Sequence, residues 1–325
     1  MIDYIMISGA ALCIAGQFTF NKLYEKKIVK GTLHLFLFPV LTAAVSALLI
    51  FVLNGFTLRW GSFTAGLAAA NAVVSILSLL CGIVVVRYGS VAVYTMFMMM
   101  GGMFLPYVFG LIFLDEKATV CRIIGMVVLI TAIILSAVPQ GGAGKGGQAN
   151  RQGGAGKTSQ TGSGGEPAAE KTKPRKLFYL LCAAVFVLNG SVSILSKVHQ
   201  TNAAALSEYD YMLWNYIFLF ALACVSFGVC YALSRKKGAC GLGGGKAFGA
   251  ACGVSAGYAV ISSLGFLLLM RAAKTLPASV MYPFSTGGSI ILTTLAARIF
   301  FKEKIGVLTW CSLALMLAGT VLFIF

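Results

Sequence analysis

The sequence predicts an all-α integral membrane protein in which ten transmembrane helices form two inverted five-helix repeats. Three observations lead to this fold class. Of the 325 residues, 59% are hydrophobic and only 10% are charged, whereas a soluble domain carries roughly 25% charged residues. The apolar residues gather into runs long enough to cross a bilayer. The second half of the chain also repeats short motifs of the first half in the same order.

The apolar runs give the individual helices. A helix needs about 20 mainly apolar residues to span the hydrocarbon core. Ten runs of about this length lie near residues 3–22, 33–54, 63–86, 90–113, 118–138, 177–197, 210–233, 247–270, 277–300 and 305–325. The sequence therefore predicts ten spanning helices.

A polar segment divides these helices into two sets of five. Residues 139–176 are rich in Gly, Ser, Thr, Lys and Gln and have no apolar periodicity, a composition typical of a disordered tether. The predicted organisation is one five-helix unit over 1–138, the tether over 139–176, and a second five-helix unit over 177–325.

The two units resemble each other at four kinds of position. The matching pairs are Lys22 with Lys197, Arg87 with Arg271, Gly101-Gly102 with Gly287-Gly288, and Glu116-Lys117 with Glu303-Lys304. A unit of five helices starts on one side of the membrane and ends on the other, so its copy is inserted upside down. Inverted repeats of this kind are typical of secondary transporters, with a substrate site near the midplane.

The tether contains a sequence that resembles a nucleotide-binding loop, Gly156-Lys157-Thr158. The phosphate-binding motif requires a glycine five positions before Gly156, where this chain has Arg151, and it must lie between a strand and a helix. Neither requirement is met, so we predict no nucleotide partner. No cofactor is indicated. With two histidines and no Cys-x-x-Cys spacing, no metal site is indicated either.

The basic residues follow the membrane topology. Lys and Arg number 25 against 9 Asp and Glu, and they lie mostly between apolar runs, where the positive-inside rule accounts for them. No soluble domain remains to form a nucleic-acid surface. Six of the 25 cations lie on the side of the termini and the other nineteen lie on the side of the tether. This asymmetry predicts that the tether is cytoplasmic.

The chain resembles the drug/metabolite transporter superfamily, EamA type. The resemblance is carried by the lysines that end the first and sixth helices, Lys22 and Lys197, and by the acidic junctions at Asp115-Glu116 and Glu303. It implies ten helices in two inverted repeats, export or exchange of small molecules without ATP, and a multi-pass protein of the plasma or inner membrane. It also implies cytoplasmic termini, which is the opposite of what the charge asymmetry predicts.

The same resemblance implies a small-molecule substrate and contact with membrane lipid, and it leaves room for a homodimer. One departure concerns the related small multidrug proteins, which carry a membrane-embedded Glu eight residues before the lysine of the first helix. This chain has Ile14 there, so the sequence does not support proton exchange through such a Glu.

Candidate substrate-binding residues are polar or aromatic side chains inside the apolar runs, together with the two helix-ending lysines. They are Lys22, Asn71, Ser75, Tyr94, Lys197, Ser255, Tyr258, Ser262 and Tyr282. The alternative role for the hydroxyls and amides is hydrogen bonding between helices, and for the lysines it is snorkelling to the interface. Pro106 and Pro283 remove a backbone hydrogen bond and are candidate gating bends.

Glu116 and Glu303 lie where a new helix begins, which favours helix capping by the carboxylate. Two other functions remain open beside transport. A membrane-embedded enzyme, such as a lipid-modifying transferase, needs an acid–base set, but neither His34 nor His199 has a carboxylate motif beside it. A non-transporting membrane subunit is the third alternative. We expect a transporter and no enzyme.

Overall fold

The computed structural model describes residues 2–29, 31–85, 91–117, 119–137, 175–236, 245–301 and 306–323. Within these ranges the chain forms ten α-helices and no strand. The helices are α1 (Ile2–Lys27), α2 (Thr32–Leu53), α3 (Ser62–Val85), α4 (Val91–Phe113), α5 (Val120–Ala137), α6 (Arg175–Thr201), α7 (Glu208–Lys236), α8 (Gly245–Ala272), α9 (Ala278–Phe301) and α10 (Val307–Leu322).

The predicted all-α membrane fold is confirmed. Eight of the described helices are long and apolar enough to cross a membrane, and the other two, α5 and α10, are shorter apolar helices. Helices suit the bilayer because each satisfies its own backbone hydrogen bonds where no water is present. The predicted tether lies outside the described residues except at its end, because α6 already begins at Arg175. The division into repeats separated by this tether stays a prediction.

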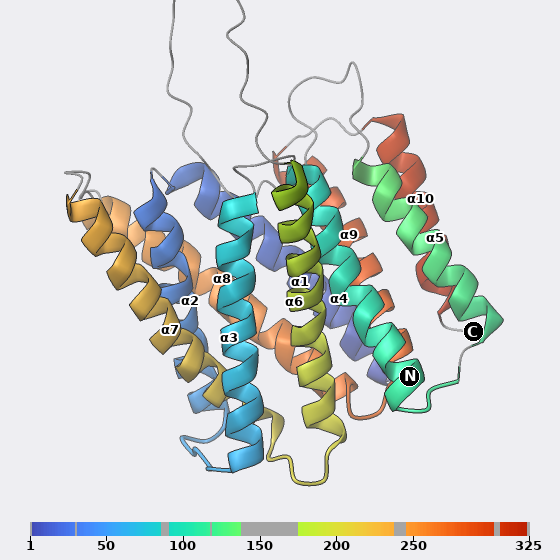
Figure 1. Ribbon diagram of the computed structural model, residues 1–325, viewed down its shortest axis with the longest axis horizontal. Helices are drawn as coiled ribbons and strands as arrows, with labels where there is room; N and C mark the ends of the chain where they lie inside the picture. Colours follow the sequence, from blue (N-terminus) through green and yellow to red (C-terminus); the bar gives the residue numbers. More distant parts are fainter. Residues whose placement is uncertain are drawn as a thin grey trace, which may run out of the picture.

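The helices pack as two layers (Figure 1). One layer has the order α7, α3, α6, α4, α5, and the other has the order α2, α8, α1, α9, α10. The layers meet chiefly where α2 packs on α7, α4 on α9 and α5 on α10. A shift of five helices converts each layer into the other, so every packed pair within one layer has its counterpart in the other. Two like five-helix units of opposite orientation would pack in this way.

Both ends of the chain lie toward the lower end of the bundle in Figure 1. We call this end the termini face. It carries the connections α2–α3 (54–61), α4–α5 (114–119), α6–α7 (202–207) and α8–α9 (273–277). The α8–α9 connection is termed the α8–α9 corner below.

Glycines bring α4 and α6 into close contact. A Cβ on Gly101 would lie 2.1 Å from the carbonyl oxygen of Phe186, and a Cβ on Gly190 would lie 2.7 Å from the carbonyl oxygen of Gly101. Both distances are far below van der Waals contact, so side chains at these positions would separate the two helices. Small residues at interfaces are the usual means by which membrane helices approach closely.

Candidate functional site

Polar side chains meet between α3 and α7. Asn71 is 2% exposed, and its side-chain amide donates to the Oδ1 atom of Asn215, 3.1 Å away. The Ser75 hydroxyl donates to the Asn71 carbonyl oxygen at 2.8 Å. The Oδ1 atom of Asn71 is buried without a hydrogen-bond partner in the protein. An unpaired acceptor in a membrane interior is costly unless a ligand or water supplies the donor.

Helix α8 supplies a second group of polar side chains. Ser255 is fully buried, and its hydroxyl also lacks a partner in the protein. The Tyr258 ring packs on Phe38 at 4.8 Å between centroids, and its hydroxyl lies within hydrogen-bonding reach of Gln17 and Ser262. Asn71 and Ser255 thus lie on corresponding helices of the two layers, and each has an unpaired polar atom.

Helix α7 contributes polar residues that our sequence interpretation missed. The Ser263 hydroxyl donates to Tyr216 at 3.4 Å, and Tyr216 is next to Asn215 in the chain. The available signal was the pair Asn215-Tyr216 inside an otherwise apolar run. We refer to Gln17, Asn71, Asn215, Tyr216, Ser255, Tyr258, Ser262 and Ser263 as the central polar residues. All of their side chains are uncharged amides or hydroxyls.

Tyr94 and Tyr282 have other surroundings. Tyr94 is 5% exposed, its hydroxyl lies 3.6 Å from the sulfur of Met98, and its ring fills the space beside Gly82. Tyr282 is 4% exposed and donates its hydroxyl to the Ser193 carbonyl oxygen at 2.6 Å. Both tyrosines therefore contact a neighbouring helix, Tyr94 at Gly82 of α3 and Tyr282 at Ser193 of α6.

The two candidate gating prolines lie inside α4 and α9. Pro106 has no N–H, so the carbonyl oxygen of Gly102 lacks its usual helical donor. The Ser193 hydroxyl approaches this oxygen at 3.5 Å, while the Ser193 carbonyl accepts from Tyr282, the neighbour of Pro283. Ser193 of α6 thus lies between the two proline-containing helices. Helix α2 contains a further proline, Pro39, which we did not predict as a bend.

The Lys197 ammonium is buried and binds backbone carbonyl oxygens. The residue is 4% exposed, and its Nζ atom donates to the carbonyl oxygens of Ala273 and Leu276, each at 2.7 Å. These carbonyls belong to the α8–α9 corner, where the helix has ended and its last carbonyls need donors. Lys22, at the corresponding place on α1, is partly exposed.

Glu116 caps a helix, but not the helix that follows it. Its two carboxylate oxygens accept from the backbone N–H groups of Ala278 at 2.6 Å and Ser279 at 2.8 Å. These are the first residues of α9, which lies in the other layer. Lys197 and Glu116 therefore hold the two sides of the α8–α9 corner, one through carbonyls and the other through amides. Glu303 lies outside the described residues.

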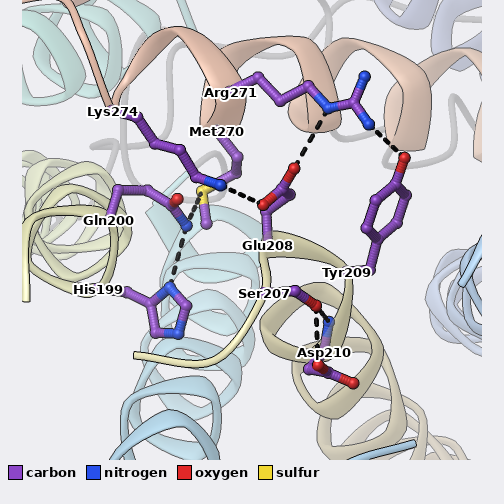
Figure 2. Close-up of polar contacts among 9 residues, drawn as sticks. All are labelled: His199, Gln200, Ser207, Glu208, Tyr209, Asp210, Met270, Arg271 and Lys274. Atoms are coloured by element: carbon purple, nitrogen blue, oxygen red, sulfur yellow. Dashed lines mark hydrogen bonds and ion pairs between the residues drawn. The ribbon is translucent and has the colours of Figure 1, made fainter. Parts of the chain in front are cut away.

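A third contact, made by α7, reaches the end of α8 and the α8–α9 corner (Figure 2). The Glu208 carboxylate pairs with Arg271 at 3.2 Å and with Lys274 at 2.5 Å. Arg271 also donates to the Tyr209 hydroxyl, and its guanidinium lies 5.4 Å from the centre of that ring. The side chain of Glu208 is 10% exposed, whereas those of Arg271 and Lys274 are 44% and 48% exposed.

The start of α7 is also tied to the α2–α3 connection. Asp210 accepts from the Asn54 side chain at 3.0 Å and from the Arg59 backbone at 3.2 Å. The Trp214 indole donates to the Arg59 carbonyl oxygen at 2.9 Å, and Trp60 packs on Trp214 edge to face at 4.9 Å. These indoles lie near helix ends, where tryptophan side chains commonly anchor membrane helices at the interface.

His199 is fully buried near the termini face (Figure 2). Its ring nitrogens lie 3.1 Å from the Thr64 hydroxyl and 2.9 Å from the Gln200 amide, and its ring stacks on Tyr211 at 4.3 Å. Among the described residues, no group of three or more His, Cys, Asp or Glu could hold a metal ion.

Comparison with known proteins agrees with this architecture. The family model described as Small Multidrug Resistance protein matches residues 246–316, which cover α8, α9 and most of α10. A curated relative, "Probable 4-amino-4-deoxy-L-arabinose-phosphoundecaprenol flippase subunit ArnE" of Hamiltonella defensa subsp. Acyrthosiphon pisum (strain 5AT), is 38% identical over 58 residues. That match covers 18% of this chain and 51% of the relative, so the chain spans about half the length of the curated relative it matches.

A solved crystal structure of another protein has the same fold. It matches 97% of this chain and 94% of its own chain with a TM-score of 0.65, at 14% sequence identity. The apolar helices and these matches identify a multi-pass membrane protein, and the sequence matches support a transporter-like role in general. The family model and the curated relative agree with the resemblance of the sequence to the drug/metabolite transporter superfamily, to which the small multidrug resistance proteins belong.

Proposed function

We propose that the protein is a secondary transporter that exports or exchanges small metabolites, amino acids or amphipathic compounds by alternating access, without ATP. The observation that carries this proposal is the packing of two layers that interchange under a shift of five helices. Such an arrangement can close on either side of a central site by similar movements.

The central polar residues are the proposed substrate site. They come from α1, α3, α7 and α8, and two of them, Asn71 and Ser255, present buried oxygens without a protein partner. Hydroxyls and amides suit a ligand that offers both donors and acceptors. Lys197 is better placed as a structural anchor, since its Nζ atom donates to two carbonyl oxygens of the α8–α9 corner.

Two other functions compete with this proposal. The curated relative is described as a flippase subunit, which favours transport or lipid flipping over a membrane-embedded enzyme. The same description also supports a non-transporting subunit as the runner-up. It adds lipid-linked amino sugars to the amphipathic compounds that a substrate screen should contain.

Uptake and efflux in proteoliposomes test the proposal. The purified chain is reconstituted and screened against a metabolite library, with and without a pH or sodium gradient. We expect flux of at least one compound, and no flux under any condition would refute the transporter. The double variant N71A/S255A should reduce that flux, whereas T131A, which changes an exposed hydroxyl on α5, should not. Equal flux in N71A/S255A and T131A would refute the proposed substrate site but not the transporter itself.

A further inference from the structure

The termini face is closed by contacts that run between the two layers and converge on the α8–α9 corner. Lys197 reaches it from α6, Glu116 from the α4–α5 connection and Glu208 from the first turn of α7. The three side chains that make these contacts all come from one layer, while the corner belongs to the other. A substrate path through this face would require some of these contacts to break.

The three contacts differ in how readily they can be released. The Lys197 ammonium is buried, and both it and the Glu116 carboxylate satisfy backbone groups at helix ends. Breaking them would leave buried peptide groups unpaired, which is expensive. The partners of Glu208 are about half exposed, so water can solvate Arg271 and Lys274 once the carboxylate withdraws. Of the three contacts, the Glu208 ion pairs are the ones whose cationic partners already face water, which makes Glu208 the contact that opens first.

The sequence makes this contact one-sided. Lys197, Glu116 and Arg271 each have a counterpart in the other repeat, at Lys22, Glu303 and Arg87 respectively. Glu208 has none, because the first turn of α2, which begins Thr32-Leu33-His34, contains no acidic residue. An acid at the start of α7 therefore adds ion pairs to the termini face that the same position of the other repeat does not supply on the opposite face.

We propose that Glu208, through Arg271 and Lys274, is a releasable lock that holds the termini face closed and biases the protein toward the state open on the opposite face. This inference rests on the proposed alternating-access function. It assigns Glu208 a positioning role in gating, with no contact to substrate required.

Hydrogen–deuterium exchange of the full-length protein in nanodiscs tests the lock. E208Q removes the charge and nearly preserves the side-chain shape. We expect the amides of 202–212 and 270–278 to exchange about tenfold faster, the factor that corresponds to about 1.4 kcal/mol, while α5 is unchanged. The matched control D3N removes an acidic charge from the same face outside the network. Unchanged exchange in E208Q, or equal acceleration in D3N, would overturn the proposal.

A second variant keeps the test valid if E208Q does not fold. R271Q/K274Q removes the lock from its exposed side and should accelerate the same two segments, whereas unaltered exchange would contradict the lock. The readout does not depend on flux. Faster exchange in a protein that transports nothing would retain the lock and reject the proposed function. Flux without faster exchange would reject the lock and retain the proposed transport function.

Discussion

Replacement of Glu116 by Gln tests whether a carboxylate from one layer stabilises a helix of the other. In the structure, the two oxygens accept the Ala278 and Ser279 amides at 2.6 and 2.8 Å. A Gln side chain can accept one of these amides and turns an NH₂ group toward the other. It also loses the interaction of a negative charge with the start of α9.

The magnitude follows from these two contacts. Hydrogen bonds to a charged group contribute about 1.5–3 kcal/mol and neutral ones about 0.5–1.5 kcal/mol, while an unpaired buried N–H costs about 1–3 kcal/mol. Weakening one bond and losing the other should therefore cost about 2–4 kcal/mol. For a chain of this size, that loss corresponds to a fall of about 3–6 °C in the unfolding midpoint.

Thermal unfolding of the purified protein in one detergent measures the effect. The matched control is D115N, which removes the same charge one residue away. Asp115 is exposed and has φ +50°, a conformation that Asn tolerates well. We expect D115N to change stability by less than about 0.5 kcal/mol. Equal midpoints for E116Q and D115N would refute the cross-layer cap.

Three further predictions address packing, anchoring and gating. G101A should destabilise the protein by about 3 kcal/mol or more, because its Cβ would meet an α6 carbonyl oxygen at 2.1 Å. The control G66A, whose Cβ would meet nothing within 4 Å, should leave stability unchanged or slightly raise it. Similar unfolding midpoints for the two variants would contradict the close packing of α4 and α6. K197M should lower the unfolding free energy by about 2–4 kcal/mol, since two carbonyls lose a charged donor, and should spare the substrate KM; a raised KM with normal stability would instead indicate substrate contact. P106A/P283A should slow transport in proteoliposomes, and unchanged rates would reject the gating role of these bends.

Parts of the candidate site could be read from the sequence. Asn71, Ser255 and Tyr258 stood out as polar side chains within apolar runs, and the structure gives the first two an unpaired atom. Their partners could not be predicted, because Asn215 and Gln17 belong to helices far away in the chain. Tyr94 and Tyr282 lie at near-equivalent places in the sequence, yet their hydroxyls make different contacts, since each depends on what the neighbouring helix offers.

The sequence by itself determined the ten helices and the membrane class. Both are local properties, because a run of apolar residues must satisfy its backbone hydrogen bonds internally wherever it lies in the bilayer. Only the tertiary structure decided how the helices are paired into layers and which groups the charged side chains meet. Glu116 was expected to cap the next helix and instead caps α9, from 162 residues away in the chain. Such partners follow from the crossing of packed helices, which no local pattern of residues encodes.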